Sequence, residues 1–470
     1  MSTVNVLGMD YGASNGRGIV GSFDGEKLNI NEVHRFPNKS VQIGAGTYWD
    51  ILNLYNELKT CISESRSKHI CISSIGIDTW GLDFAILDSK GNLLGNPHTY
   101  RDTRTKNILE KFVKGNSRYE MFLRTGYVPL GIETFFQLLS MKEFEPDILE
   151  IADKLLFIPN LLNYFLTGES TCENTIASIS VMLDIFEKAW IGDLLKSYDL
   201  PDILPKLIRQ GEMVGRTRGL LKDEIGINSV PVVSIAHHDT ASAIAAVPAA
   251  DKEEIIYISC GTWSVVGTKT ARPLIDEDVF KNGFVNELGY NDEIMFVKNL
   301  TGLWILQECE REWAGEGYVI NYEHMQHAAE KSDFESFIDT NDPVFAEPGN
   351  MQKKISDYCI RTSQAVPVNK EEYYSCVVLG LAMAYKEAID QIIKLTGKRY
   401  KRIHIIGGGS RNKYLCRMTS VLTGMEVAAG PYEATVIGNI LAQLIYLKEI
   451  KDLDEGVQII EKSFECSILT

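Results

Sequence analysis

The segments VLGMDYGASNGRGIV at 6–20 and IIYISCGTWSVVG at 255–267 decide the fold, because they repeat one pattern half a chain apart. In each segment an apolar run leads into a glycine, Gly12 or Gly261, and then into small hydroxyl residues before a second β-rich run. A glycine turn lets backbone N–H groups approach phosphate oxygens closely. The repeat therefore predicts two related domains, each with a phosphate-binding hairpin.

The two copies of the pattern differ where a cation would bind. Asp10 of the first copy aligns with Ser259 of the second, so only the first offers a carboxylate that can hold Mg²⁺ directly or through water. Ser14, Asn15 and Arg17 follow within reach of phosphate oxygens, and the Arg17 guanidinium could offset transferred charge. The pattern predicts one metal–phosphate site with Asp10 as metal ligand. The alternative is that Asp10 only caps a turn.

Length and element order predict two domains. The 470 residues exceed the size of one ordinary hydrophobic core, and helical periodicity alternates with buried strands in both halves, as in α/β domains. The only short polar connector near the midpoint is 248–254. We therefore expect domains at 1–248 and 249–470.

Within the first half, the pattern predicts three β-rich runs followed by a helix at 48–65. The segments 70–80 and 82–88 are expected to pair with each other as a hairpin. From 105 to about 215 the signal is mostly helical, as in an insertion that shapes one side of a cleft.

Charge and cysteine usage restrict the class of function. The formal net charge of −16 opposes binding to nucleic acid or to an anionic membrane surface. The longest apolar run, 155–166, is too short to span a bilayer, and nine cysteines without a C-x-x-C pair suit a reducing compartment. We predict a soluble cytoplasmic protein that acts on small molecules, as a monomer or small homo-oligomer, with no nucleic-acid or membrane partner.

Asp239, in HHDTASA at 237–243, is the candidate catalytic base. It stands where a strand pattern gives way to a helical one, and a helix N-terminus favours an ionised carboxylate that can accept a proton from a sugar hydroxyl. Simple capping of the helix is the alternative. The adjacent His237 and His238 favour the functional interpretation, because His238 offers a hydrogen-bond donor to a polyol.

Three further segments carry candidate ligand contacts. GGGSRN at 407–412 follows a strand and precedes a helix, where backbone N–H groups can approach a nucleotide; a plain turn is the alternative. NLTGLWILQ at 299–307 has a polar residue at each end, and either could face a ligand. IGIDTWGLDF at 75–84 supplies carboxylates and an indole around Gly81, as sugar sites do, or else it is a hairpin whose tryptophan fills the core.

Together these segments resemble the FGGY family of carbohydrate kinases, within the actin and hexokinase superfamily. The resemblance spans essentially the whole chain in a fixed order: DYGASNGR at 10–17, GIDTWGLDF at 76–84, YRDTR at 100–104, HDTASA at 238–243, SCGTWS at 259–264, GLWILQ at 302–307, IIGGGSRN at 405–412 and EATVIGN at 433–439. It implies an α/β fold of two ribonuclease-H-like domains with an interdomain catalytic cleft.

The resemblance also implies an activity and its residues. It is strongest to the family's kinases of L-rhamnulose, which implies ATP-dependent, Mg²⁺-assisted phosphorylation of that ketose at O1 in L-rhamnose breakdown. Asp239 would be the proton acceptor. The implied sugar contacts are Gly81, His238, Asp239, Thr240 and Asn299. The implied ATP contacts are Ala13, Ser14, Asn15, Gly16, Arg17, Thr262, Gln307, Gly408 and Gly409.

Two alternatives remain open from the sequence. The same fold could phosphorylate another ketose, such as L-fuculose or a pentulose, because residue spacing does not reveal which hydroxyls find partners. A non-enzymatic, actin-like nucleotide switch would use the same two hairpins, but it gives no role to the His-His-Asp segment.

Overall fold

The computed structural model describes residues 3–249 and 254–469, which form two compact units. The first unit comprises Met1–Pro248, Thr270–Phe296 and Thr435–Ser463, and the second comprises Ala249–Lys269, Val297–Ala434 and Phe464–Thr470. Part of the expected connector, 250–253, lies outside the described residues. The first break between the units follows Pro248, but the chain crosses again at later points, so 1–248 and 249–470 as domains stay a prediction.

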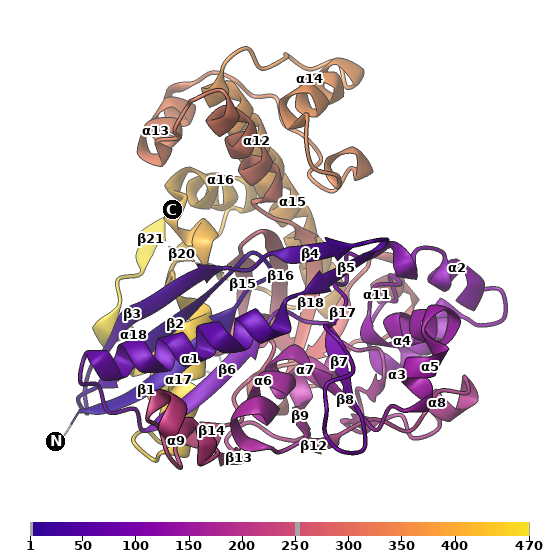
Figure 1. Cartoon of the computed structure of the whole chain (residues 1–470). Coiled ribbons are helices and arrows are strands. Elements are labelled where there is room, and N and C mark those ends of the chain that lie inside the picture. The colour runs from indigo at the N-terminus through magenta and orange to yellow at the C-terminus, as the bar shows by residue number, and fades with distance from the viewer. Residues whose placement is uncertain (1–2, 250–253, 470) are drawn as a thin grey trace. The chain divides into compact units, whose positions relative to one another are not determined.

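The first unit is built on a six-stranded sheet in the order β13-β14-β6-β1-β2-β3 (Figure 1). Strand β1 lies antiparallel to β2 and parallel to β6, and β6 lies parallel to β14. The strands are β1 (Val4–Tyr11), β2 (Asn15–Phe23), β3 (Leu28–Pro37), β6 (Ser74–Thr79), β13 (Met213–Arg216) and β14 (Pro231–Val233).

Six strands of a seven-stranded sheet repeat this order as β21-β20-β19-β15-β16-β18, and β17 is the seventh strand, next to β18. Strand β15 lies antiparallel to β16 and parallel to β19, which lies parallel to β20. The strands are β15 (Ile255–Cys260), β16 (Trp263–Thr270), β18 (Ile294–Thr301), β19 (Arg402–Ile406), β20 (Glu426–Ala429) and β21 (Ser467–Leu469). The strand-for-strand match confirms the predicted duplication of one α/β topology.

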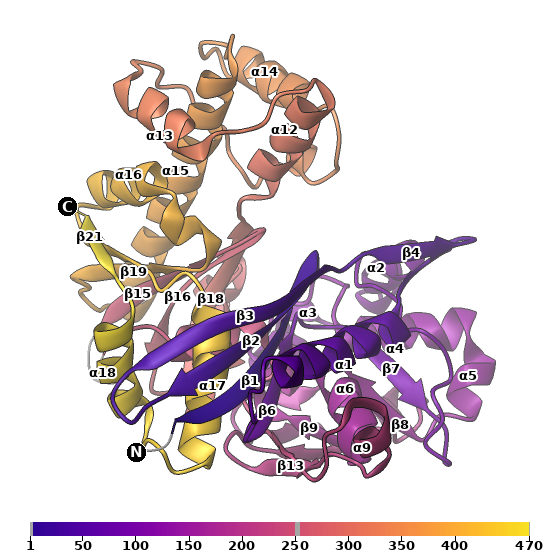
Figure 2. The same cartoon turned by 60° about the vertical axis from the view of Figure 1, so that its left-hand side comes forward.

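Helices α1 (Ile51–Ser67) and α17 (Ala434–Tyr446) cover opposite faces of the first sheet (Figure 2). A Cβ added at Gly18 of β2 would lie 2.5 Å from Cys61 of α1, whereas one at Gly21 would lie 2.8 Å from Ile440 of α17. Because residues three apart on a strand point to opposite faces, the two helices pack on opposite sides. Glycine on β2 is what lets both helices approach closely.

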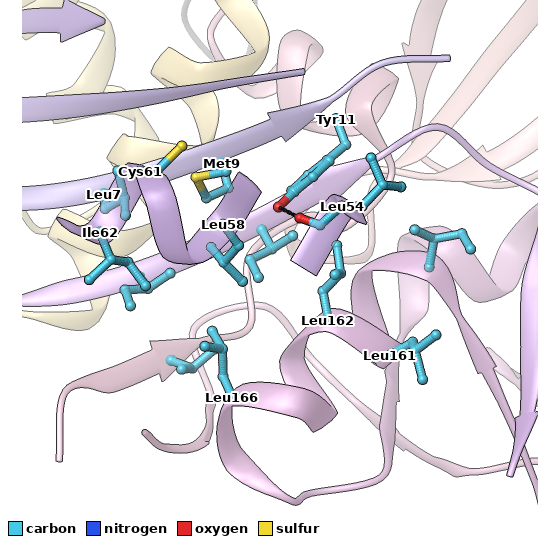
Figure 3. Packing of buried hydrophobic residues seen from close by; sticks show 14 of the residues in the cluster. Leu7, Met9, Tyr11, Leu54, Leu58, Cys61, Ile62, Leu161, Leu162 and Leu166 are labelled. Atoms are coloured by element: carbon cyan, nitrogen blue, oxygen red, sulfur yellow. Dashed lines mark hydrogen bonds between the residues drawn. The ribbon is translucent and has the colours of Figure 1, made fainter. Parts of the chain in front are cut away.

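The core between α1 and the sheet follows from the helical spacing of apolar residues in 51–62 (Figure 3). Leu54, Leu58 and Cys61 are buried on one face of α1, and the Asp50 side chain caps the helix by accepting from the Asn53 N–H. Figure 3 shows the Tyr11 hydroxyl directed at the Leu54 carbonyl oxygen, to which it donates at 3.1 Å. The predicted helix at 48–65 is thereby confirmed within a few residues.

The first unit contains further strands and helices besides the six-stranded sheet, α1 and α17. The strands are β4 (Ser40–Ile43), β5 (Gly46–Trp49), β7 (Phe84–Leu87), β8 (Lys154–Phe157), β9 (Thr171–Glu173), β10 (Leu183–Asp184), β11 (Ala189–Trp190), β12 (Lys206–Ile208) and β17 (Val285–Leu288). The helices are α2 (Ile108–Phe112), α3 (Arg118–Thr125), α4 (Thr134–Phe144), α5 (Pro146–Glu150), α6 (Ile158–Thr167), α7 (Asn174–Ser178), α8 (Leu194–Ser197), α9 (Leu220–Ile225), α10 (Asp239–Ala245), α11 (Glu277–Lys281) and α18 (Leu453–Ser463).

Two expectations about this unit are wrong. Strand β7 pairs antiparallel with β8 rather than forming a hairpin with β6, because β1 and β14 already occupy both edges of β6. The segment 105–215 is also not mostly helical, since β8 to β12 interrupt its short helices.

In the second unit, the long helix α15 (Lys370–Thr396) runs beside α16 (Lys413–Thr423). Helices α12 (Trp304–Gly315), α13 (Tyr322–Lys331) and α14 (Met351–Arg361) gather around one end of α15 (Figures 1 and 2). No helix within the described residues is both long and apolar enough to cross a membrane.

Close packing of α17 on α10 generates a prediction. A Cβ at Gly438 of α17 would lie 1.8 Å from the backbone oxygen of Ser242 in α10, and a backbone atom cannot rotate away as a side chain can. We expect Gly438→Ala to destabilise the protein by about 1–3 kcal/mol, as overpacking does. Urea unfolding measures this loss.

The matched control is Gly315→Ala, also a helical glycine, where an added Cβ would meet nothing within 4 Å. It should leave the unfolding midpoint unchanged or raise it. Equal stability of the two variants would contradict the close approach of α17 to α10.

Candidate functional site

The turn between β1 and β2 presents the first predicted phosphate loop. The Gly12 N–H donates to the Asn15 oxygen at 2.9 Å, and the Asn38 N–H donates to the Ser14 oxygen at 3.0 Å. Ser14 and Asn15 are exposed, while Ala13 is half-buried. Gly16 is buried, and a Cβ there would lie 2.3 Å from the Phe36 ring. The loop is therefore exposed at its tip and fixed at its base.

Asp10 and Arg17 are register partners on β1 and β2, and they form an ion pair. Arg17 Nη2 and Nε donate to Asp10 Oδ2 at 2.8 and 3.0 Å. Asp10 lies within a strand, which excludes the alternative that it caps a turn. The predicted metal ligand and the predicted phosphate-binding guanidinium are thus neighbours at the base of the loop.

Two further carboxyl groups, Asp78 at the end of β6 and Asp239 at the start of α10, interact electrostatically with Asp10. Burial and the negative charge of Asp10 raise the pKa of Asp78, against a hydrogen bond from Asn439 that lowers it. Burial and Asp10 also raise the pKa of Asp239, to about 7. Ionisation of all three carboxyl groups would therefore place more negative charge here than Arg17 alone neutralises.

This cluster of three carboxyl groups is compatible with Mg²⁺, which binds through hard oxygen ligands. Oδ1 of Asp78 is buried and has no hydrogen-bond partner among the described residues. No set of three or more His, Cys, Asp or Glu side chains in the described part of the chain is arranged to hold a metal by itself. A magnesium ion here would keep water or phosphate oxygens among its ligands, as Mg²⁺ usually does.

Helix α10 starts at Asp239, and His238 occupies the N-cap position. Because Asp239 is the first helical residue, the capping alternative is wrong. Its side chain is 30% exposed, and Oδ1 accepts from the Thr240 hydroxyl at 3.2 Å. Oδ1 also lies 3.5 Å from His238 Nε2. A partly exposed carboxyl group at a helix N-terminus with a pKa near neutrality can act as a general base.

The structure distinguishes the two adjacent histidines. His237 is completely buried, with its ring nitrogens 3.1 and 3.3 Å from the side-chain amides of Asn160 and Asn163. Burial lowers the pKa of His237 to about 3, so this imidazole stays neutral. His238 retains 12% exposure and faces Asp239. Of the two, only His238 is placed to meet a ligand.

Glu173 and Thr175 anchor the backbone of this segment, and neither was predicted from the sequence. The His237 N–H donates to Glu173 Oε2 at 3.0 Å, and the His238 N–H donates to the Thr175 hydroxyl at 3.1 Å. Thr175 in turn donates to Glu173 Oε2 at 2.5 Å. Burial raises the pKa of Glu173 to about 7. The only sequence signal was an acidic residue in a stretch that is otherwise apolar or small.

Gly81 lies beside His238. A Cβ at Gly81 would lie 2.1 Å from Ile179 and 3.8 Å from the His238 ring. The Thr79 N–H just before it donates to the His237 oxygen at 2.9 Å, which joins β6 to the His-His-Asp segment. The structure therefore brings Gly81, His238, Asp239 and Thr240 together in the first unit.

The second unit gathers predicted nucleotide contacts around its own hairpin. The Thr262 hydroxyl donates to Gln307 Oε1 at 3.2 Å, and the Leu303 N–H donates to the Gly261 oxygen at 2.8 Å. A Cβ at Gly409 would lie only 2.1 Å from Cys260 Sγ at the end of β15. The neighbouring Gly408 is exposed, as is Asn299 on β18. Backbone groups are thus accessible where a nucleotide could bind.

Models of a known family match both halves of the chain. The N-terminal domain of the FGGY family of carbohydrate kinases matches residues 5–245, and its C-terminal domain matches residues 256–447. A rhamnulokinase of Bacteroides thetaiotaomicron is 36% identical over 98% of this chain and 94% of its own length. A rhamnulokinase of Oceanobacillus iheyensis is 36% identical over 98% of this chain and 97% of its own length.

Among solved structures, glycerol kinase from Plasmodium falciparum, determined with ADP, matches with a TM-score of 0.81. The match covers 99% of this chain and 94% of that one at 16% identity. At this identity the likeness establishes the fold alone.

The Thr175 hydroxyl generates a prediction about the His-His-Asp segment. Thr175→Val keeps the side-chain shape but removes the group that accepts from the His238 N–H and donates to Glu173. In a sugar-kinase assay, the kcat of this variant should fall by roughly tenfold. The substitution leaves the buried His238 N–H without a partner, and Asp239, the next residue, is then misplaced.

Thr419→Val is the matched control, since Thr419 is equally buried and donates only to the Leu415 carbonyl oxygen of its own helix. It should change stability but leave kcat intact. If Thr175→Val keeps the wild-type kcat, Thr175 does not position Asp239.

Proposed function

This chain belongs to the FGGY family of carbohydrate kinases, and we propose that it transfers the γ-phosphoryl group of ATP to O1 of L-rhamnulose, producing L-rhamnulose 1-phosphate. The observation that supports L-rhamnulose as the substrate is the near-full-length similarity to proteins named rhamnulokinase at 36% identity. The site geometry supports the reaction type, because a general base and a phosphate loop lie in the same unit.

Asp239 is the proposed proton acceptor. Its carboxyl group is accessible, and a pKa of about 7, raised by burial and Asp10, leaves both its ionised and its protonated form populated near neutral pH and makes the ionised form a stronger base than an ordinary aspartate. Asp239 would take the O1 proton as that oxygen attacks the γ-phosphorus. Gly81, His238 and Thr240 would contact other parts of the sugar, together with Asn299.

We assign charge stabilisation to the residues where the first phosphate loop joins its two strands. Asp10 would hold Mg²⁺, which when bound neutralises phosphate charge during transfer. Arg17, now paired with Asp10, would contribute a fixed positive charge beside the loop. The backbone of 13–16 would orient the phosphate oxygens.

The ATP contacts proposed in the second unit are Thr262, Gln307, Gly408 and Gly409. Transfer requires the γ-phosphorus to reach the sugar oxygen beside Asp239, so the interdomain cleft expected from the sequence is part of this proposal. We also infer a cytoplasmic location, since all nine cysteines are free thiols. A monomer or small homo-oligomer remains the expected assembly.

The test is ADP release by the purified chain with Mg²⁺ and ATP, measured separately with L-rhamnulose, L-fuculose, L-xylulose and glycerol. We expect the highest kcat/KM with L-rhamnulose. Asp239→Asn should reduce that rate by about 10²–10⁴, as loss of a general base does.

The control without sugar measures wasteful ATP hydrolysis. A higher kcat/KM with another ketose would overturn the substrate but keep the kinase mechanism, and near wild-type turnover by Asp239→Asn would overturn the assigned base.

A further inference from the structure

Glu287, on β17, is a buried carboxyl group to which the mechanism above gives no role. Its side chain is only 3% exposed, and its Oε2 has no hydrogen-bond partner among the described residues. A buried, unpaired carboxylate oxygen costs free energy, so its presence needs an explanation.

The Glu287 carboxyl group faces the His238 ring. Its Oε2 lies 3.5 Å from Nδ1 of His238, which is also buried without a hydrogen-bond partner in the described structure. On the other side of the ring, Nε2 lies 3.5 Å from Asp239 Oδ1. The three side chains therefore form a row of carboxyl, imidazole and carboxyl groups that ends at the proposed base.

One short helix, α7, supports the backbone at two members of this row, Glu287 and His238. Next to Glu287, the Leu288 N–H donates to the Ser178 hydroxyl of α7 at 3.0 Å. The His238 N–H donates to Thr175 of the same helix. The Asn286 N–H, on the other side of Glu287, donates to the Gly126 oxygen at 2.8 Å. The backbones of Glu287 and His238 are thus fixed relative to each other.

We propose that Glu287 is a positioning residue that sets the tautomer of His238. The proton of His238 would lie on Nδ1, facing Glu287 Oε2 at 3.5 Å, and because a neutral imidazole carries one N–H, Nε2 would remain a hydrogen-bond acceptor facing Asp239. Two acceptors, Nε2 and Asp239 Oδ1, then stand side by side for two hydroxyls of the sugar. O1–H donates to Asp239, and a neighbouring hydroxyl donates to His238.

This inference rests on the proposed kinase function and changes one detail expected from the sequence, in which His238 was a donor to the sugar. Electrostatics agree with the geometry. Burial lowers the pKa of His238, and Glu287 opposes that shift. Burial raises the pKa of Glu287, and His238 opposes that shift in turn. Burial, the larger effect on His238, thus favours its neutral imidazole, and the attraction between the two groups favours an ionised Glu287 that can accept a hydrogen bond.

The test begins with ¹⁵N NMR of the full chain labelled at its eight histidines, with the His238 signals assigned by their loss in His238→Gln. In the wild-type protein without sugar, His238 should carry its proton on Nδ1. A proton on Nε2 in the wild type would overturn the proposal. This readout needs no turnover, so it stands even if L-rhamnulose proves not to be the substrate.

Glu287→Leu tests whether Glu287 is what sets the His238 tautomer. It removes the acceptor but fills the volume, so the His238 proton should move to Nε2, and the KM for the sugar should rise on the order of tenfold or more while the KM for ATP stays unchanged. Glu287→Gln keeps a side-chain oxygen and should restore part of the sugar affinity.

The matched control is Glu133→Gln, another fully buried carboxyl group of the first unit, which accepts from the Leu130 and Gly131 N–H groups. It should leave the His238 tautomer unchanged. Retention of the Nδ1 proton and of the sugar KM in Glu287→Leu would show that Glu287 does not act through His238.

Discussion

The hydrogen bonds from the His237 and His238 backbone N–H groups to Glu173 and Thr175 are the constraint on which the proposed chemistry depends. They fix the residues just before α10, and so they fix where Asp239 enters the site. From the far side, Gly438 allows α17 to approach α10 at backbone distance. The position of Asp239, the proposed base, is therefore set by buried packing and hydrogen bonds rather than by an exposed loop.

Duplication of the sheet explains how one topology serves two purposes. In both units, a strand hairpin with a glycine turn adjoins a parallel strand. In the first unit, carboxyl groups stand where these strands end, at Asp10 and Asp78. In the second, Ser259 and Cys260 replace Asp10 and its neighbour, and glycines 407–409 pack against Cys260. The first copy therefore carries the charge, and the second exposes backbone suited to a nucleotide.

The features that the sequence predicted correctly are those set by residues close together in the chain. Both hairpins and α1 follow from glycine turns and helical spacing, and Asp10 and Asp239 were recognisable as carboxylates at strand and helix ends. The pairing of β7 with β8 was not predictable, because it depends on both edges of β6 being occupied by distant strands. Glu173 and Glu287 were missed for a related reason: a single acidic residue has no periodic signal, and its role arises only from long-range packing.

The central claim, that Asp239 is the base, is tested most directly by the pH dependence of kcat/KM for the sugar at saturating ATP and Mg²⁺. Burial and Asp10 raise the pKa of Asp239 to about 7, and only its ionised form can accept the O1 proton. The account predicts that kcat/KM is constant above about pH 8 and falls about tenfold for each pH unit below about 6. A rate independent of pH from about 5.5 to 8.5 would contradict it.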